Sequence, residues 1–338
     1  MELIIGTPNL RTMSPSPVVA VGNFDGVHLG HQAILRQAVA RAAAGGGVAA
    51  VLTFEPHPSR ILAPNREIRH LYPFQTKMRL IESAGIARTY VADFDTAFAQ
   101  QSPETFAKRF LSERLGCREV IVGRDYRFGK DREGTLDHLI ALGRTCGFSV
   151  VSVEPVTIDG VTVSSSRIRA ALSAGDVALA GRMLGRRYAT RSKVIRGDGV
   201  GKTLGFPTAN LRLPNELIPG PGIFAVRIDL LRAEGVLRYD GVVYIGDRPT
   251  FGKTERRMEA YLFDFDGDLY DRRLMIHFID RVRGDIAFGN TADLIARMRM
   301  DVDEARHLLL TATPPNEAGG ADGIDLVANM QREESDDV

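Results

Sequence analysis

The sequence predicts a doubly wound α/β domain followed by an antiparallel β-barrel domain with a C-terminal helix. Over residues 18–174, short apolar runs typical of buried strands alternate with helical patterns, which favours a parallel sheet. Beyond residue 192, short strand patterns follow one another between turns rich in Gly, Pro and Asp, which favours a barrel. A length of 338 residues leaves room for both domains and a tail.

The composition is that of an ordinary globular protein, with 44% hydrophobic and 25% charged residues. A formal net charge of +1 argues against nucleic acid as a partner, so any phosphate recognition must be local. Cys117 and Cys146 form no CxxC motif, which argues against a disulfide framework or a zinc site. Without a membrane-length apolar run or a signal-peptide pattern, we expect a cytoplasmic protein with no membrane partner.

The first strand and helix meet at a glycine-rich turn. Residues 18–21 predict a buried strand, Gly22 ends it, and a helical pattern starts near Gly30. Such a turn aims backbone N–H groups at an anion. His28 and His31 lie at the same helix start, where both could donate to phosphate oxygens. The pair could instead be half of a metal site or ordinary helix-cap residues.

The rest of the first domain continues the alternation. We predict strands over residues 48–54, 89–92, 119–122 and 149–153, and helices over residues 75–84, 103–115, 136–146 and 168–174. The loop after residue 122 carries Asp125, Tyr126 and Phe128, which could hold a ring or nucleotide or could form a solvated turn.

A serine run opens the helix at residue 168. Ser165 and Ser166 suit helix capping, and together with Arg169 they could form a second anion site at the helix N-terminus.

The second domain is predicted to span residues 186–312, after a first domain of residues 1–185. Its strand candidates are Val194, Ile195, Leu211, Leu213 and residues 223–228, 242–245, 260–265 and 274–278. A closing helix is predicted over residues 291–310, and residues 313–338 have the composition of a disordered tail.

Two stretches of this domain carry candidate chemistry. The glycines around Gly197, Gly201 and Lys202 lack P-loop spacing and could be simple hairpin turns. Thr208 and Asn210 place two neutral oxygen ligands on one side of an extended segment, which suits Mg²⁺. Glu259 begins a strand and could act as a general base or be merely solvated.

The motifs together resemble the prokaryotic bifunctional riboflavin kinase/FMN adenylyltransferase (FAD synthetase) family, whose first domain is a Rossmann-like nucleotidylyltransferase. The resemblance covers residues 18–310. It is carried by Gly-Asn-Phe-Asp-Gly-Val-His-Leu-Gly-His (22–31), Phe-Glu-Pro-His-Pro (54–58), Gly-Arg-Asp-Tyr-Arg-Phe-Gly (123–129), Ser-Ser-Ser-Arg-Ile-Arg (164–169) and Pro-Thr-Ala-Asn (207–210).

The resemblance implies two ATP-dependent reactions, from riboflavin to FMN in the barrel and from FMN to FAD in the first domain. Glu259 would be the kinase base, and His28 and His31 would stabilise the adenylyl-transfer transition state. Thr208 and Asn210 would hold Mg²⁺, while Asp125, Tyr126 and Phe128 would position flavin or nucleotide. The residues implied to bind ATP or its phosphates are Gly22, Phe24, Gly30, Ser165, Ser166, Arg169, Gly197, Gly201 and Lys202.

The chain departs from the family pattern at four places. Ser166 replaces a threonine but keeps the hydroxyl, and Thr162 stands where a basic residue is frequent. Ser192 stands where glycine is usual, and Tyr244 where another residue is usual. The alternatives are a chain with only one of the two activities, a nucleotidylyltransferase for another acceptor, and a non-enzymatic flavin-binding protein.

Overall fold

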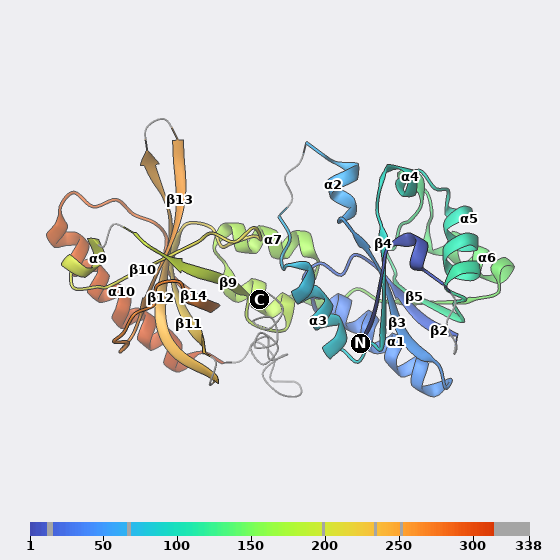
Figure 1. Cartoon of the computed structure of the whole chain (residues 1–338), viewed down its shortest axis with the longest axis horizontal. Helices are drawn as coiled ribbons and strands as arrows, with labels where there is room; N and C mark the ends of the chain where they lie inside the picture. The colour runs from blue at the N-terminus through green and yellow to red at the C-terminus, as the bar shows by residue number, and fades with distance from the viewer. Residues whose placement is uncertain (12–15, 66–68, 198–199, 233–234, 251–252, 314–338) are drawn as a thin grey trace. The chain divides into compact units, whose positions relative to one another are not determined.

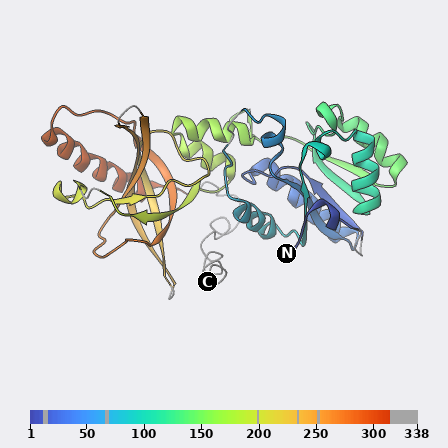
Figure 2. The ribbon, with the colours of Figure 1, turned by 45° about the horizontal axis from the view of Figure 1, so that its top comes forward.

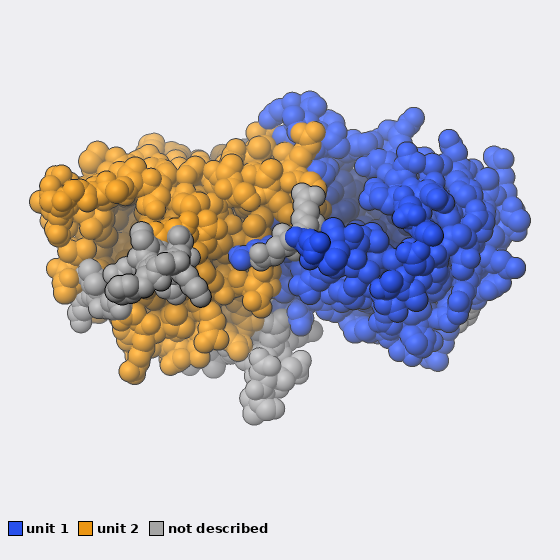
Figure 3. Space-filling view, turned by 90° about the horizontal axis from the view of Figure 1, so that it is seen from above, with its two compact units in different colours: residues 1–164 blue, residues 165–338 orange. Residues whose placement is uncertain are grey.

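The computed structural model describes residues 1–11, 16–65, 69–197, 200–232, 235–250 and 253–313. The chain divides into two compact units, residues 1–164 and 165–338 (Figure 3). The predicted domain boundary falls later, at residues 185–186. The two divisions differ in two helices, α7 (Ser165–Ala174) and α8 (Val177–Leu184), because α8 packs against strand β14 (Arg273–Arg283) of the second unit.

The first unit contains a six-stranded sheet in the order β1-β4-β3-β2-β5-β6, with every neighbouring pair parallel (Figure 1). Its strands are β1 (Glu2–Ile5), β2 (Pro17–Val21), β3 (Val48–Glu55), β4 (Arg88–Asp93), β5 (Glu119–Gly123) and β6 (Ser149–Val153). The predicted parallel doubly wound sheet is therefore confirmed. β1 is an addition at the edge of the sheet, where four mostly exposed residues give little apolar pattern.

Helices cover both faces of this sheet. α1 (Leu29–Ala44) contacts β2, β3 and β5, and the opposite face carries a core that joins Val19 and Val21 to Phe106 and Phe110. These two phenylalanines lie on a π-helix, η2 (Phe106–Arg114), which continues α5 (Pro103–Thr105) where we predicted one helix. The remaining elements of this unit are η1 (Thr7–Asn9), α2 (Pro58–Leu62), α3 (Phe74–Ser83), α4 (Thr96–Ala99), η3 (Lys130–Arg132), α6 (Leu136–Cys146), β7 (Thr157–Ile158) and β8 (Val161–Thr162).

The strand order reverses between β2 and β5. From β2 the chain proceeds through β3 to β4 on one side, and from β5 to β6 on the other. Since the two strands are parallel neighbours, the segments that follow them leave from the same edge of the sheet. Doubly wound sheets bind ligands at such a reversal. The topology thus brings the turn after residue 21 close to the loop after residue 122.

The second unit is a closed barrel in the order β10-β13-β12-β11-β14-β9, with antiparallel neighbours. Besides α7, α8 and β14, its elements are β9 (Ala189–Ile195), α9 (Val200–Thr203), β10 (Ala209–Leu211), β11 (Gly222–Arg232), β12 (Gly235–Thr250), β13 (Lys253–Leu262) and α10 (Thr291–Thr311). The predicted barrel and closing helix are confirmed. Residues 263–265, predicted as strand, follow β13, and Asp264 there has a positive φ of 55°.

Alternate side chains of the barrel strands pack in two separate hydrophobic cores. Phe224 and Phe278 are fully or nearly fully buried and their rings touch edge to face. Ala225 instead joins Ala305 and Leu309 of α10 in a second cluster. Because successive strand residues point to opposite faces, α10 marks the outer face of the barrel (Figure 2). Among the described helices, none is both long and apolar enough to cross a membrane. The predicted tail, apart from residue 313, lies outside the described residues.

Candidate functional site

The start of α1 is built around two stacked imidazoles. His28 is the N-cap of the helix, and its Nδ1 accepts a hydrogen bond of 3.3 Å from the backbone N–H of His31. The two rings stack with centroids 3.7 Å apart. His28 is only 6% exposed, so its ring is held in place by packing as well as by the cap. The structure therefore brings the two predicted histidines together at the N-terminus of a helix.

The turn that leads to this helix has an unusual backbone. Phe24 and Val27 both have positive φ angles, of 51° and 39°, and both side chains are fully buried. The Phe24 ring meets His31 edge to face at 5.1 Å and also lies against Gly22. A Cβ at Gly30 would lie 3.2 Å from the His28 ring. Gly30 therefore leaves room for His28, a packing role beside the phosphate-binding role that the resemblance implies.

A buried cation that the sequence analysis did not single out lies after β3. Lys77 of α3 is 7% exposed, and its Nζ lies 3.9 Å from the Glu55 carboxylate. Burial lowers the pKa of Lys77, and the carboxylates of Glu55 and Asp25 partly oppose that shift. Asp25, in the turn after β2, accepts a hydrogen bond from the Leu71 backbone N–H. A lysine in an amphipathic helix gives no sequence signal of burial, which is why pattern reasoning missed it.

The loop after β5 separates its three predicted residues. Asp125 is exposed, whereas Phe128 is 6% exposed and packs in the core with Phe106. Tyr126 stacks on Phe128 with ring centroids 5.6 Å apart and packs, partly buried, against the same core. The aromatic residues thus support the loop, and Asp125 is the one of the three whose side chain faces solvent.

The predicted residues of the serine run open α7 in the second unit. Ser165 and Ser166 are its first two residues, and Arg169 follows one turn later. Ser166 is exposed, while Ser165 and Arg169 are partly buried. Hydroxyls and a guanidinium at a helix start suit an anion, so the anion site expected from the sequence stays a prediction.

In the barrel, three segments far apart in the sequence converge on Glu259. Asn210 of β10 and Tyr244 of β12 are its direct cross-strand partners on either side. Thr208, just before β10, donates a hydrogen bond of 3.2 Å from Oγ1 to Glu259 Oε2. Residue alternation places Glu259 on the same face as Tyr261, which packs toward α10, so the group lies on the outer face of the barrel.

The glycine-rich segment before β10 makes room for this group. A Cβ at Gly197 would collide with the Asn210 side-chain amide, and one at Gly201 would lie 2.6 Å from Thr208 Oγ1. Both glycines are therefore required by close packing, besides the phosphate contact that the resemblance implies. The side chain of Lys202 lies outside the described part of the chain.

Ser192 and Tyr244, the two barrel residues that differ from the family pattern, each make a side-chain hydrogen bond. Ser192 is buried and donates a hydrogen bond of 2.6 Å from Oγ to the Arg212 carbonyl. Tyr244 donates a hydrogen bond of 3.3 Å to Oδ2 of Asp285, which lies between β14 and α10. Sequence reasoning missed Asp285, because an acidic residue between a strand and a helix is typical of an ordinary turn.

The two groups of residues suit different chemistry. A pair of imidazoles at a helix N-terminus can stabilise negative charge on phosphate oxygens. A carboxylate flanked by hydroxyl and amide oxygens can accept a proton and share a hard cation with phosphates. Among the described residues, no group of three or more His, Cys, Asp or Glu is placed to hold a metal ion.

Known proteins match both units in the same order. Residues 11–167 match the family model described as FAD synthetase, and residues 184–309 match the model described as riboflavin kinase. The bifunctional riboflavin kinase/FMN adenylyltransferase of Haemophilus influenzae is 34% identical over 306 residues, covering 90% of this chain and 98% of the relative. The enzyme of the same name from Pseudomonas fluorescens is 37% identical over 309 residues, which cover 91% of this chain and 98% of the relative.

A solved structure covers most of the chain as well. It is described as a macrolide-efflux protein from Streptococcus pneumoniae and aligns with a TM-score of 0.78 and 30% identity. The alignment covers 87% of this chain and 95% of that chain. The likeness thus extends over both units.

Proposed function

This chain belongs to the bifunctional riboflavin kinase/FMN adenylyltransferase family, and we propose how its own residues carry the two reactions. The enzyme phosphorylates riboflavin to FMN and then transfers the adenylyl group of ATP to FMN, giving FAD and pyrophosphate. ATP is the co-substrate of both steps. The region that matches riboflavin kinase contains the barrel and most of α10, and the region that matches FAD synthetase contains strands β2 to β6 of the parallel sheet.

Glu259 is the general base of the kinase reaction. A terminal alcohol of riboflavin must lose its proton as its oxygen attacks the γ-phosphorus of ATP, and a carboxylate within hydrogen-bonding reach can accept that proton. The convergence of Thr208, Asn210 and Glu259 on adjacent strands is the observation that carries this assignment. Glycines at 197 and 201 leave the space in which the two neutral side chains can take up that arrangement.

Mg²⁺ fits the donors of this group. Thr208 and Asn210 supply a hydroxyl and an amide oxygen, which are hard ligands that magnesium accepts while it keeps several waters and binds phosphates. Bound there, the ion would neutralise charge on the ATP phosphates. The glycine-rich segment that contains Gly197, Gly201 and Lys202 would bind the same phosphates.

The adenylyltransferase reaction needs no general base, because the FMN phosphate is already an anionic nucleophile at neutral pH. It needs alignment and charge stabilisation. His28 and His31 donate to the oxygens that gain charge as pyrophosphate leaves. The turn that contains Gly22 and Phe24, together with Gly30 in the first turn of α1, holds them at the start of the helix.

The start of α7, in the second unit, is a further candidate phosphate site. Ser165, Ser166 and Arg169 combine hydroxyls, a guanidinium and a helix N-terminus, all of which favour an anion. Asp125 positions a substrate from the loop after β5, and Tyr126 and Phe128 fix that loop on the core.

A chromatographic time course with riboflavin, ATP and Mg²⁺ tests the assignment. We expect FMN to appear first and FAD to follow. His28→Ala should abolish FAD formation and leave FMN formation intact, whereas Glu259→Ala should abolish FMN formation and leave the conversion of added FMN intact. If either substitution removed both activities from a folded protein, the assignment of one site to each unit would be wrong.

A further inference from the structure

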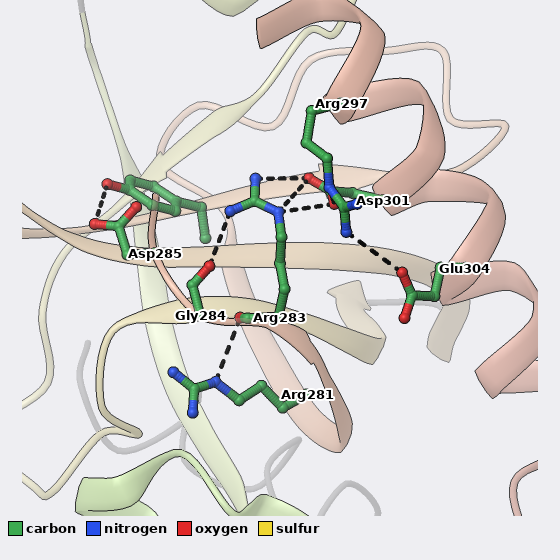
Figure 4. A network of polar contacts seen from close by, with 8 residues as sticks. Arg281, Arg283, Gly284, Asp285, Arg297, Asp301 and Glu304 are labelled. Atoms are coloured by element: carbon green, nitrogen blue, oxygen red, sulfur yellow. Dashed lines mark hydrogen bonds and ion pairs between the residues drawn. The ribbon is translucent and has the colours of Figure 1, made fainter. Parts of the chain in front are cut away.

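The segment of residues 284–290, between β14 and α10, is fixed at its start by a buried ion pair (Figure 4). Arg283 Nε and Nη2 donate to the Asp301 carboxylate at 2.9 and 2.8 Å, and Arg297 donates to the same carboxylate at 2.8 Å. Asp301 is only 3% exposed. Arg283 Nη1 also donates to the Gly284 carbonyl at 2.9 Å, so the network defines where the segment leaves the barrel.

One residue further on, the segment is tied to the strand that borders Glu259. The Tyr244 hydroxyl donates to Asp285 Oδ2 at 3.3 Å (Figure 4). A Cβ at Gly246 would collide with the phenol of Tyr244, so the ring lies along β12 in space that only glycine leaves open. Tyr244 is also the cross-strand partner of Glu259. The tie between strand and segment therefore lies beside the kinase base.

The phenol remains a hydrogen-bond donor at neutral pH. Burial raises the pKa of Tyr244 to about 12, and the neighbouring carboxylates of Asp285 and Glu259 act in the same direction. The phenol therefore keeps its proton and can donate a hydrogen bond to the Asp285 carboxylate at every pH at which the enzyme can be assayed.

We propose that Tyr244 is a positioning residue for riboflavin phosphorylation, holding Asp285 so that residues 284–290 stay on the barrel face that carries Glu259. This inference rests on the proposed role of Glu259. A segment held there limits the conformations in which the riboflavin alcohol can approach the carboxylate. The effect is on productive binding of the flavin and leaves proton transfer itself to Glu259.

Tyr244→Phe tests the proposal, because it removes the hydroxyl and keeps the ring. We expect the KM for riboflavin in the kinase reaction to rise about fivefold, the effect of one lost hydrogen bond, while kcat stays within about twofold. Asp285→Ala should raise KM by the same factor, and the double variant by no more than either single variant. Tyr270→Phe, at an exposed tyrosine of the same unit, is the matched control and should leave KM unchanged.

Two results would overturn the proposal: an unchanged KM in Tyr244→Phe, or effects of the two single substitutions that add in the double variant. Conversion of added FMN to FAD, measured on the same preparations, shows that the first unit is folded, and a kcat for FMN formation close to the wild-type value shows that the barrel is folded. Glu259→Gln separates this inference from the proposed function. If Glu259→Gln retains FMN formation, the proposed function fails; if it abolishes FMN formation and Tyr244→Phe behaves as wild type, only the inference fails.

Discussion

The proposed sites of the two units are positioned by different means. In the first unit the backbone does the positioning, since a turn with positive φ angles and a histidine N-cap place His28 and His31 at a helix start. In the second unit, side chains from separate antiparallel strands lie beside Glu259, and the cross-strand register and the hydrogen bond from Thr208 set the geometry. In a parallel sheet, the loops that follow the strands lie at the same edge. In an antiparallel barrel, the register of neighbouring strands places individual side chains beside one another.

This difference predicts different sensitivities. The proposed site of the first unit, which is formed by one continuous turn, should tolerate the loss of a polar contact elsewhere in the chain. A site made by side chains from several strands depends on whatever keeps those strands and their connecting segments in register.

The largest effect is expected at the ion pair under the barrel helix. Asp301→Ala leaves Arg283 largely buried without its carboxylate, which should lower the free energy of unfolding of the second unit by about 3 kcal/mol. Chemical denaturation measures this. Glu304→Ala is the matched control on the same helix, because that half-exposed carboxylate lies 3.5 Å from Arg297 and should contribute little. Equal losses in the two variants would contradict the account.

Gly197→Ala should affect the kinase reaction alone. The new Cβ collides with the Asn210 amide and displaces it, which should lower the rate of FMN formation about 100-fold. The conversion of FMN to FAD should be unchanged. Gly181→Ala in α8, where a Cβ makes only an ordinary contact of 3.5 Å, is the control. Normal FMN formation in Gly197→Ala would show that Asn210 has no role.

Gly30→Ala is the counterpart in the first unit, with a smaller effect. Its Cβ would lie 3.2 Å from the His28 ring, so the imidazole must shift by only a few tenths of an ångström. We expect FAD formation from FMN to fall about tenfold and FMN formation to stay at the wild-type rate, both followed by chromatography. A loss of kinase activity in this variant would mean that the two sites are not independent.

The smallest effect concerns pH and the buried carboxylate of Asp229. Burial raises its pKa, but hydrogen bonds from His277 and Arg238 outweigh burial and lower the value from 3.8 to about 2. The folded state therefore gains stability above about pH 4 and loses it as the pH falls toward 2. The difference in unfolding free energy between wild type and Asp229→Asn should shrink from pH 5 to pH 2. A difference that grows on acidification would have the wrong sign.

The sequence was sufficient for the fold because the apolar patterns were strong. Parallel strands such as β2 and β3 are continuous apolar runs, and barrel strands lie between clear turn signals. The edge strand β1 escaped prediction because its four residues are mostly exposed and bury no face. The π-helical geometry of η2 also has no signature in the pattern of buried phenylalanines.

Candidate site residues could be singled out from the sequence where one motif contains them. His28, His31, Thr208 and Asn210 lie in continuous motifs, so their types and spacing were enough to single them out. The contacts of Tyr244 with Asp285 and of Lys77 with Glu55 join residues 41 and 22 positions apart, and only the fold brings them together. Phe128 is the opposite case. Its place in a motif suggests that it stacks on a ring of the substrate, but in the structure its side chain packs in the core.

A mixture of the His28→Ala and Glu259→Ala proteins tests whether each unit holds one independent site. Neither variant alone should convert riboflavin to FAD. Supplied together with riboflavin, ATP and Mg²⁺, they should form FAD after a lag in which FMN accumulates, because each chain retains one intact site. A mixture that accumulates FMN but forms no FAD, or that leaves riboflavin unchanged, would contradict the assignment of one independent site to each unit.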